Sequence, residues 1–218
     1  MSKVNVQIYK PFGPSISKQD LPLDLMKDFK KDLDMIRNLP EKEQLPYRTG
    51  HSLAGGLGKE GEFLITPKVM LKWKANYFDA VIKEYSRIHR PNKEVDRIII
   101  NSAWHNYMLK NQWNPTHHHL EYFSPTFENP SISTVGYISI PKDMKPLEGA
   151  KPHNNFSGCI EWVEGREDLF QFGVYKLIPK ERDFFVFPAS LNHIVFPHNS
   201  DEPRISFSFN AVIKFKKD

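Results

Sequence analysis

The sequence predicts a single α+β domain in which strands predominate and two helices precede them. Two observations carry this prediction. Residues 20–40 and 65–90 repeat apolar side chains at helical spacing, and from residue 96 onward the chain turns to short β-branched and aromatic runs broken by Pro, Gly and Asn. Helices followed by short strands at hairpin spacing favour an antiparallel sandwich or barrel that the helices cover. We expect a helical support region at 1–95 and a β core at 96–218.

The first helix is expected in the stretch DLPLDLMKDFKKDLDMIRNLP. Leu25, Phe29, Leu33 and Ile36 fall on one face of a helix in this register, and Pro40 stops it. Charged residues fill the positions between them. This pattern predicts an amphipathic helix at the protein surface, with one face buried.

The second helix is expected in ITPKVMLKWKANYFDAVIKEYSRIHR. Thr66 stands where it can cap the helix, and Pro67 suits its first turn. One stripe of apolar side chains at helical spacing follows, consisting of Trp73, Tyr77, Val81, Tyr85 and Ile88. Such a stripe is typical of a core contact, so we expect both helices to pack on the outside of one sheet.

The strands are expected in runs that end at Pro, Gly or Asn. After the run DRIIINSAWHNYMLK, six of them follow in chain order: STVGYISIP, SGCIEWV, LFQFGVYKLIP, DFFVFP, LNHIVFP and RISFSFNAVIKF. Their number and spacing predict an antiparallel arrangement rather than a parallel sheet with crossover helices.

Composition excludes several classes of function. Thirty basic residues against 26 acidic ones, spread along the chain, give a formal net charge of only +4, which does not indicate nucleic-acid binding. No apolar run reaches the length of about 18 residues that a membrane span needs. The N-terminal residues lack the apolar stretch of a secretory signal, so we expect a cytoplasmic protein. Cys159 is the only cysteine, which excludes an internal disulfide and a thiolate zinc cluster.

Three consecutive histidines in NPTHHHLEY are the first candidate for chemistry. In an extended segment His117 and His119 point to one side and His118 to the other, so the first two can lean toward one metal ion. His193 is the best third ligand, because it lies in the apolar run LNHIVFP, where an unpaired imidazole is costly to bury. His198 is a weaker candidate and is expected to be solvated in the turn that follows.

The last strand presents two different faces. Arg204, Ser206, Ser208 and Asn210 share one face, and the residues between them, Ile205, Phe207 and Phe209, share the other. We expect the polar row to face a cavity.

Only a short turn separates His193 from Arg204, so we expect the two residues on neighbouring antiparallel strands. A guanidinium beside a metal suits a carboxylate of a molecule that also touches the metal, and the Ser206 hydroxyl can bond the same carboxylate.

The chain resembles the 2-oxoglutarate and iron(II)-dependent oxygenases, in particular their small phage-encoded and bacterial branch. The resemblance rests on SAWHNYMLKNQWNPTHHH, VGYISIP and PKERDFFVFPASLNHIVFPHNSDEPRISFSFN, which occur in the family's order over about residues 102–210. It implies a double-stranded β-helix, which is a cupin-like jelly roll. It also implies the use of Fe(II), 2-oxoglutarate and O2 to hydroxylate a small-molecule or peptidyl substrate, as prolyl hydroxylases do, with 2-oxoglutarate decarboxylated to succinate.

The resemblance also implies roles for particular residues. Iron would be held by His117, His119 and His193, and the C5 carboxylate of 2-oxoglutarate by Arg204 and Ser206. Two further residues are candidate cosubstrate or supporting contacts, namely Asn106 and Tyr137.

Three alternatives stay open. The usual ligand set of these oxygenases is two histidines and one carboxylate, and a register two residues later would make Glu121 the carboxylate ligand in place of a third histidine. A cupin-like metal enzyme could use three histidines without 2-oxoglutarate, although Arg204 and Ser206 would then have no role. A non-catalytic jelly-roll protein with a binding or structural role is the third reading. In the oxygenase reading, substrate choice is expected to reside in the loops 120–131 and 142–157.

Overall fold

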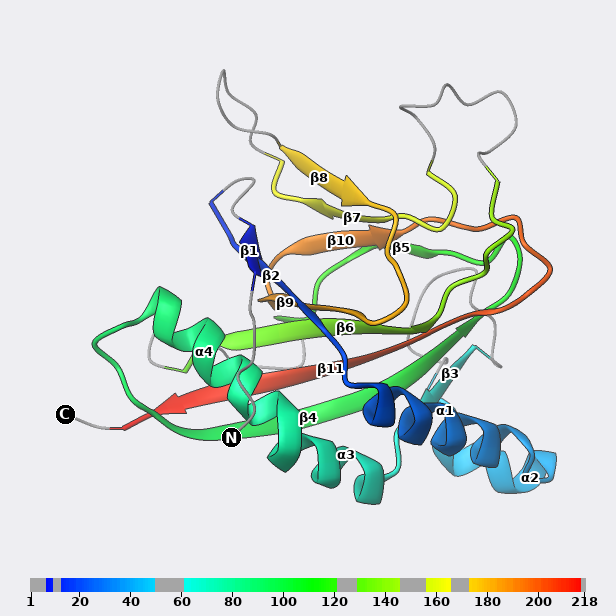
Figure 1. The fold of residues 1–218 in the computed structure, drawn as a ribbon, viewed down its shortest axis with the longest axis horizontal. Helices are drawn as coiled ribbons and strands as arrows, with labels where there is room; N and C mark the ends of the chain where they lie inside the picture. Colours follow the sequence, from blue (N-terminus) through cyan, green and yellow to red (C-terminus); the bar gives the residue numbers. More distant parts are fainter. Residues whose placement is uncertain are drawn as a thin grey trace.

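Two antiparallel sheets face one another in the computed structural model, which describes residues 7–9, 13–49, 61–120, 129–145, 156–165 and 173–216. The larger sheet has the strand order β1 (Gln7–Tyr9), β2 (Ile16–Asp20), β9 (Asp183–Pro188), β6 (Ser131–Ser139), β11 (Arg204–Phe215), β4 (Val95–Met108) and β3 (Glu62–Leu64). The smaller sheet has the order β5 (Asn114–His117), β10 (Asn192–Val195), β7 (Ile160–Val163) and β8 (Val174–Leu177). Figure 1 shows the smaller sheet lying over the larger one.

The helices cover the face of the larger sheet that points away from the smaller sheet (Figure 1). In chain order they are α1 (Leu23–Arg37), α2 (Glu41–Gln44), a 3-10 turn (Leu45–Tyr47), α3 (Pro67–Trp73), a π-helical turn (Lys74–Phe78) and α4 (Asp79–His89). This arrangement confirms the predicted fold class, which is mostly β with helices packed on one sheet. The region 1–95 also supplies strands β1, β2 and β3 of the larger sheet, in addition to the helices.

The first predicted helix is confirmed as α1. Its stripe of Leu25, Phe29, Leu33 and Ile36 is fully buried against the larger sheet. At 25 cal/mol per Å² of buried apolar surface, each such side chain contributes about 1.5–3 kcal/mol relative to an exposed one. The hydrophobic pattern therefore makes a large contribution to the docking of α1.

The second predicted helix differs from the prediction in two respects. A π-helical turn separates α3 from α4, and the end of the predicted stripe is wrong, because Ile88 is 38% exposed. Thr66 does precede the helix, but its side chain forms no capping hydrogen bond. Instead its hydroxyl donates to the Asp32 carboxylate on α1 over 2.5 Å, which ties the two helical segments together.

Strand β11 is the long central strand of the larger sheet and shows the predicted alternation. Ile205, Phe207 and Phe209 are buried in the cluster that the helices cover. On the opposite face, Arg204, Ser206 and Ser208 line a cavity between the sheets.

Gly136 on β6 pairs with Phe207 on β11, and a Cβ atom on this glycine would lie 2.3 Å from the phenylalanine ring. Only glycine leaves room for that ring.

One predicted arrangement is wrong. His193 and Arg204 are not on neighbouring strands, because β10 lies between β5 and β7 in the smaller sheet and β11 lies between β6 and β4 in the larger one. The turn between them crosses from one sheet to the other. The two residues therefore approach the cavity from opposite walls.

Candidate metal and cosubstrate site

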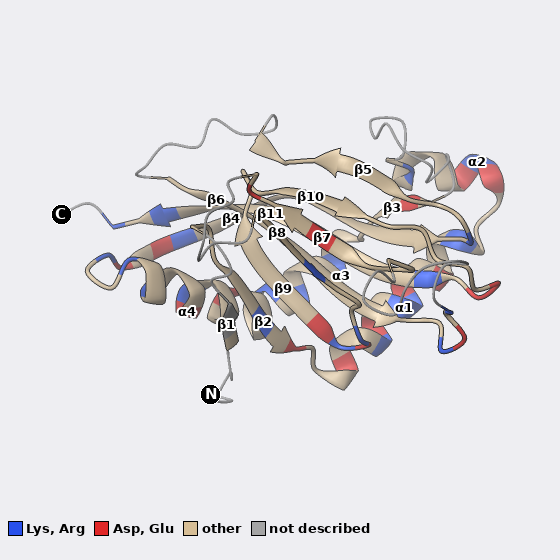
Figure 2. Cartoon of the chain, turned by 90° about the horizontal axis from the view of Figure 1, so that it is seen from above, with Lys and Arg blue, Asp and Glu red and all other residues tan. Residues whose placement is uncertain are grey.

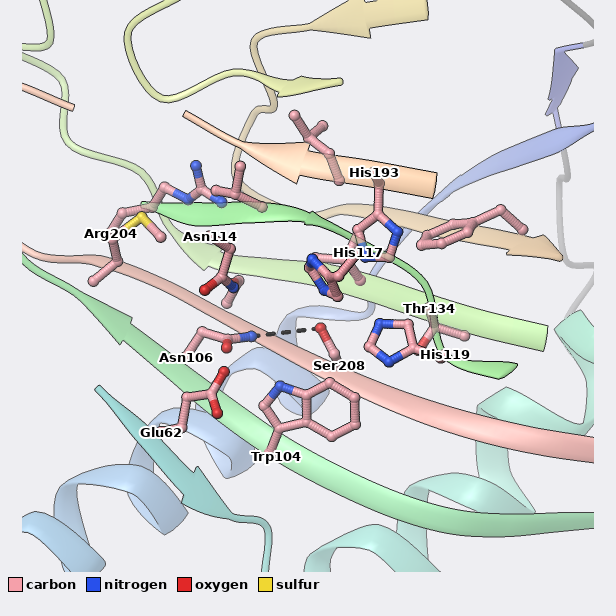
Figure 3. A pocket seen from close by; sticks show the side chains of 16 residues that line it. Glu62, Trp104, Asn106, Asn114, His117, His119, Thr134, His193, Arg204 and Ser208 are labelled. Atoms are coloured by element: carbon pink, nitrogen blue, oxygen red, sulfur yellow. Dashed lines mark hydrogen bonds between the residues drawn. The ribbon is translucent and has the colours of Figure 1, made fainter. Parts of the chain in front are cut away.

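Three histidines converge on one wall of the cavity between the sheets. His117 ends β5 and pairs directly with His193 on β10, and His119 follows two residues later, held by a hydrogen bond from its backbone N–H to the Ala189 carbonyl over 2.9 Å. One possible ligand atom from each histidine lies within 4.8 Å of the other two. Figure 3 shows the three imidazoles facing the same space. This spacing suits a single metal ion with nitrogen contacts of about 2 Å.

Two of the imidazoles are oriented by backbone carbonyls. Nδ1 of His117 lies 2.7 Å from the Pro115 carbonyl oxygen, and Nδ1 of His193 lies 3.1 Å from that of Leu191. A carbonyl oxygen only accepts, so each Nδ1 carries the proton and donates. The Nε2 lone pair of each ring is therefore left for a ligand in the cavity, which is how metal-binding histidines are usually held.

Burial keeps the cluster uncharged. Desolvation lowers the pKa of His119 to about 3, lowers that of His117, and places that of His193 well below its ordinary range. Neighbouring imidazoles act in the same direction in all three cases. Neutral imidazoles with free lone pairs are the form that binds a metal, so the donor set fits a borderline ion such as Fe(II).

The remaining histidines have other places. His118 is outside the cluster, and its Nδ1 accepts the Leu120 backbone N–H over 3.3 Å. The predicted solvated position of His198 is wrong: the residue is fully buried, and its Nε2 donates to the Met108 carbonyl over 3.0 Å. His105 is also fully buried, 3.0 Å from the Asp32 carboxylate. The alternative ligand Glu121 lies outside the described residues.

A row of polar side chains crosses the opposite wall. Register places Glu62, Asn106, Ser206 and Tyr137 side by side on the neighbouring strands β3, β4, β11 and β6. Arg204 is two residues before Ser206 on the same face of β11. All five side chains are buried.

Several atoms of this row have no hydrogen-bond partner. Arg204 is 2% exposed, and it donates from Nη1 to the Gly158 carbonyl over 2.9 Å while its Nε is unpaired. The Tyr137 hydroxyl, which is unpaired too, belongs to a ring whose centroid is 5.2 Å from the guanidinium carbon. Leaving such groups unpaired costs about 1–3 kcal/mol each. The orphaned donors therefore fit a carboxylate ligand, which is the chemistry of one end of 2-oxoglutarate.

Burial also sets the protonation of these anchors. It raises the pKa of Tyr137 to about 12, so the phenol keeps its proton and can donate. It lowers the pKa of Arg204 below its ordinary value, whereas the neighbouring Tyr137 and Cys159 act in the opposite direction. Both groups therefore keep their protons at neutral pH, and Arg204 lines the cavity.

Several residues of the cavity carry no signal in the sequence. Glu62, Trp104, Asn114 and Thr134 line it together with the residues already named, as Figure 3 shows. Asn114 stands three residues before His117, and Glu62 is on a three-residue strand far upstream, so neither has a recognisable spacing from the histidines.

Two facing antiparallel sheets, an imidazole cluster and a buried guanidinium across the cavity from it define a metal-dependent oxygenase of the jelly-roll class. A family model described as "Putative 2OG-Fe(II) oxygenase" matches residues 102–210, which is half of the chain. The chain belongs to this family, the 2-oxoglutarate and Fe(II)-dependent oxygenases, which are enzymes that use Fe(II), 2-oxoglutarate and O2.

Solved structures share the fold. A prolyl-4-hydroxylase from Pseudomonas putida is 14% identical, with a TM-score of 0.56 over 91% of this chain and 92% of its own. HygX from Streptomyces hygroscopicus, solved with nickel, 2-oxoglutarate and hygromycin B bound, is 9% identical, with a TM-score of 0.54 over 90% of this chain and 82% of its own. AviO1 from Streptomyces viridochromogenes is 12% identical, with a TM-score of 0.54 over 90% of this chain and 88% of its own. A comparison with curated proteins found no match.

Two further findings concern the surroundings of the enzyme. No helix in the described parts of the chain is long and apolar enough to cross a bilayer. Basic and acidic residues alternate along the helices and strands, without separation of the two signs, as the coloured ribbon in Figure 2 shows. The phage branch and the cytoplasmic location stay predictions from the sequence.

Proposed function

We propose that His117, His119 and His193 hold the Fe(II) ion and that the enzyme hydroxylates a C–H bond of a small-molecule or peptidyl substrate. The observation that carries the ligand assignment is the convergence of three neutral imidazoles within 4.8 Å of one another, opposite a buried guanidinium whose Nε has no partner. Three neutral ligands leave the full 2+ charge on the ion, one unit more than the common set with a carboxylate. Glu121 is the alternative third ligand.

Arg204 is the proposed anchor for the C5 carboxylate of 2-oxoglutarate. Its free Nε and its Nη groups form a fork that suits a carboxylate, and the Ser206 and Tyr137 hydroxyls stand beside it in the same region of the larger sheet. Asn106 lies next to Ser206 across β4 and β11, and its amide nitrogen donates to Ser208 over 3.4 Å. These residues bind and orient the cosubstrate from the wall opposite the histidines.

The chemistry comes from the bound ion together with 2-oxoglutarate and O2, which supply one oxygen atom to the substrate C–H bond and the other to succinate, with release of CO2. The chain itself positions the reactants and limits water. Trp104, Thr134 and Phe187 line the cavity around the imidazoles, where low polarity strengthens each electrostatic contact with the bound groups.

An anaerobic titration tests the cosubstrate assignment. Fe(II) is added first and 2-oxoglutarate second, and the visible spectrum is followed. We expect a charge-transfer band in the wild type, a weaker band in Arg204→Ala, and no band in His193→Ala, because the ion is lost. His118→Ala is the matched control, since this histidine lies outside the cluster and its loss should leave the band intact. A wild-type spectrum that is indifferent to 2-oxoglutarate would contradict the proposal.

Iron content resolves the register of the third ligand. If His119 is the ligand, His119→Ala loses iron and Glu121→Ala retains it. The opposite outcome assigns the ligand to the carboxylate. Measuring iron per chain by atomic spectroscopy after desalting, with His118→Ala alongside, separates these outcomes from a general loss of folding.

A further inference from the structure

The cavity has a second polar region, in which the unpaired atoms are acceptor oxygens. Glu62 lies on β3, the edge strand of the larger sheet, and Asn114 lies on β5, the edge strand of the smaller sheet. Asn106 on β4 is the cross-strand neighbour of Glu62. Figure 3 shows the three side chains one above the other, on the opposite side of Trp104 from His119.

Each of these side chains holds an unpaired oxygen. Glu62 Oε1, Asn106 Oδ1 and Asn114 Oδ1 have no hydrogen-bond partner, although the residues are only 2%, 8% and 7% exposed. Buried acceptors without donors are costly, and three of them lining one cavity indicate a missing group that donates several hydrogen bonds. The Asn106 nitrogen already donates to Ser208, so the amide can serve the cosubstrate side and the Glu62 side at once.

The Glu62 carboxyl group can be either protonated or ionised near neutral pH. Burial raises the pKa of Glu62 to about 7, and a hydrogen bond from the Thr49 side chain acts in the opposite direction. The neighbours that act on the Arg204 guanidinium are different ones, Tyr137 and Cys159. The cavity therefore has a cationic region at Arg204 and a separate region at Glu62 that becomes anionic when a positive group approaches.

We propose that Glu62, together with the amide oxygens of Asn106 and Asn114, binds a protonated amine or guanidine of the substrate. This inference rests on the proposed function and names its substrate class. An ammonium or guanidinium donates several hydrogen bonds and carries the charge that a buried carboxylate needs, so it satisfies all three acceptors together. The same chemistry is offered by a small-molecule amine and by a peptidyl lysine or arginine.

Matched probes test the charge preference directly. n-Butylammonium and n-butanol, which have similar shape and differ in charge, are titrated calorimetrically into the Ni(II)-loaded protein with 2-oxoglutarate present. We expect the wild type to bind n-butylammonium roughly tenfold or more tightly than n-butanol, and Glu62→Gln to lose this preference. Equal binding of the two probes, no binding of either, or an unchanged preference in Glu62→Gln overturns the proposal.

Two controls make the result specific. Glu43→Gln removes a carboxylate from an exposed position on α2 and should keep the preference of the wild type. The thermal midpoint of Glu62→Gln shows that the near-isosteric variant is folded. If the proposed function fails while this inference holds, the iron and 2-oxoglutarate band is missing and the n-butylammonium preference persists. If only the inference fails, the band is present and the preference is absent.

Proton release gives an independent readout. At pH 7 a carboxyl with a pKa of about 7 is about half protonated, so binding of a cation that holds it ionised expels about half a proton. Calorimetry in two buffers of different ionisation enthalpy measures this number, and we expect none in Glu62→Gln. The same titration with putrescine and with N-acetyl-lysine N-methylamide assigns the source, since the tighter ligand identifies a small-molecule or a peptidyl amine.

Discussion

Buried histidines lie on both sides of the larger sheet, and the two sides differ in the hydrogen-bond partners that they give the imidazoles. His105 on β4 faces the helices, where its Nε2 donates to the Asp32 carboxylate over 3.0 Å and Thr66 donates to the same carboxylate from its backbone and its hydroxyl. The cluster at His117, by contrast, has only other histidines as close metal-type ligands among the described residues. The buried imidazole of His105 has a charged partner, whereas the Nε2 atoms of His117 and His193 have no protein partner. The difference supports the proposal that the cluster holds an ion.

The largest effect on stability is expected from breaking the buried pair of His105 and Asp32. Asp32→Ala removes the acceptor for three hydrogen bonds and leaves His105 buried without a partner, so we expect a loss of about 3–5 kcal/mol in the free energy of unfolding. Urea denaturation measures it. Asp34→Ala, at an exposed carboxylate on the same helix, is the control and should cost less than about 1 kcal/mol. A mild effect of Asp32→Ala would mean that the pair is not structural.

Metal binding at the cluster of His117, His119 and His193 should stabilise the folded protein. Ni(II), which replaces Fe(II) without redox chemistry, is expected to raise unfolding stability by about 2.7 kcal/mol at a hundredfold excess over its dissociation constant. Thermal denaturation with and without a chelator checks this. His193→Ala should lose the stabilisation and His105→Gln should keep it. Equal metal stabilisation in both variants would remove the distinction between the two groups.

Acid should weaken the fold partly through His105. Burial lowers the pKa of His105 in the folded state, so below its ordinary value of 6.5 the unfolded chain takes up a proton that the folded chain does not. Stability is therefore lost as pH falls below about 6.5, by up to about 1.4 kcal/mol per pH unit for this group. Asp32, whose pKa is lowered in the fold, adds its own loss below about 3.8. Denaturation at several pH values should show a shallower acid slope for His105→Gln, and an unchanged slope would contradict this account.

The smallest effect on stability is expected from removing the hydrogen bond of the Thr66 hydroxyl to Asp32. Thr66→Val keeps the volume and removes the hydroxyl that donates to Asp32, while the backbone N–H bond to the same carboxylate remains over 3.0 Å. The expected loss is about 1 kcal/mol, the usual net value of one hydrogen bond. Thr134→Val removes a hydroxyl that bonds the backbone of Phe209 and provides a comparison within the sheet. A loss above that of Asp32→Ala would be inconsistent with this ranking.

The sequence predicts those parts of the molecule that repeat along the chain. The stripe on α1 and the alternation on β11 follow from periods of about 3.6 and 2, because one face of each element meets the core. The metal ligands were assigned from the triplet HHH and one histidine in an apolar strand, and the structure brings these side chains together. Their role as ligands stays a prediction.

Contacts between residues far apart in the sequence leave no periodic pattern from which they could be predicted. Asp32 and His105 are 73 residues apart, and Glu62 and Asn106 meet only because β3 pairs with β4. His198 was expected in solvent because it stands in a polar turn, but the turn folds onto the Met108 carbonyl. The crossing of the chain between sheets after β10, which separates His193 from Arg204, likewise depends on tertiary packing rather than on local residues.

The three histidines and Arg204 lie on opposite sheets, so the packing of the core between the sheets sets the distance between them. Trp162 and Phe187 are buried where β7 and β9 face each other, so they help set the distance between the proposed metal ligands and the proposed anchor Arg204. A change of volume at Trp162, which packs against Phe187 and does not itself line the cavity, would alter the reach required of 2-oxoglutarate. In the proposed binding mode, interior packing would therefore affect which length of cosubstrate fits between the two walls.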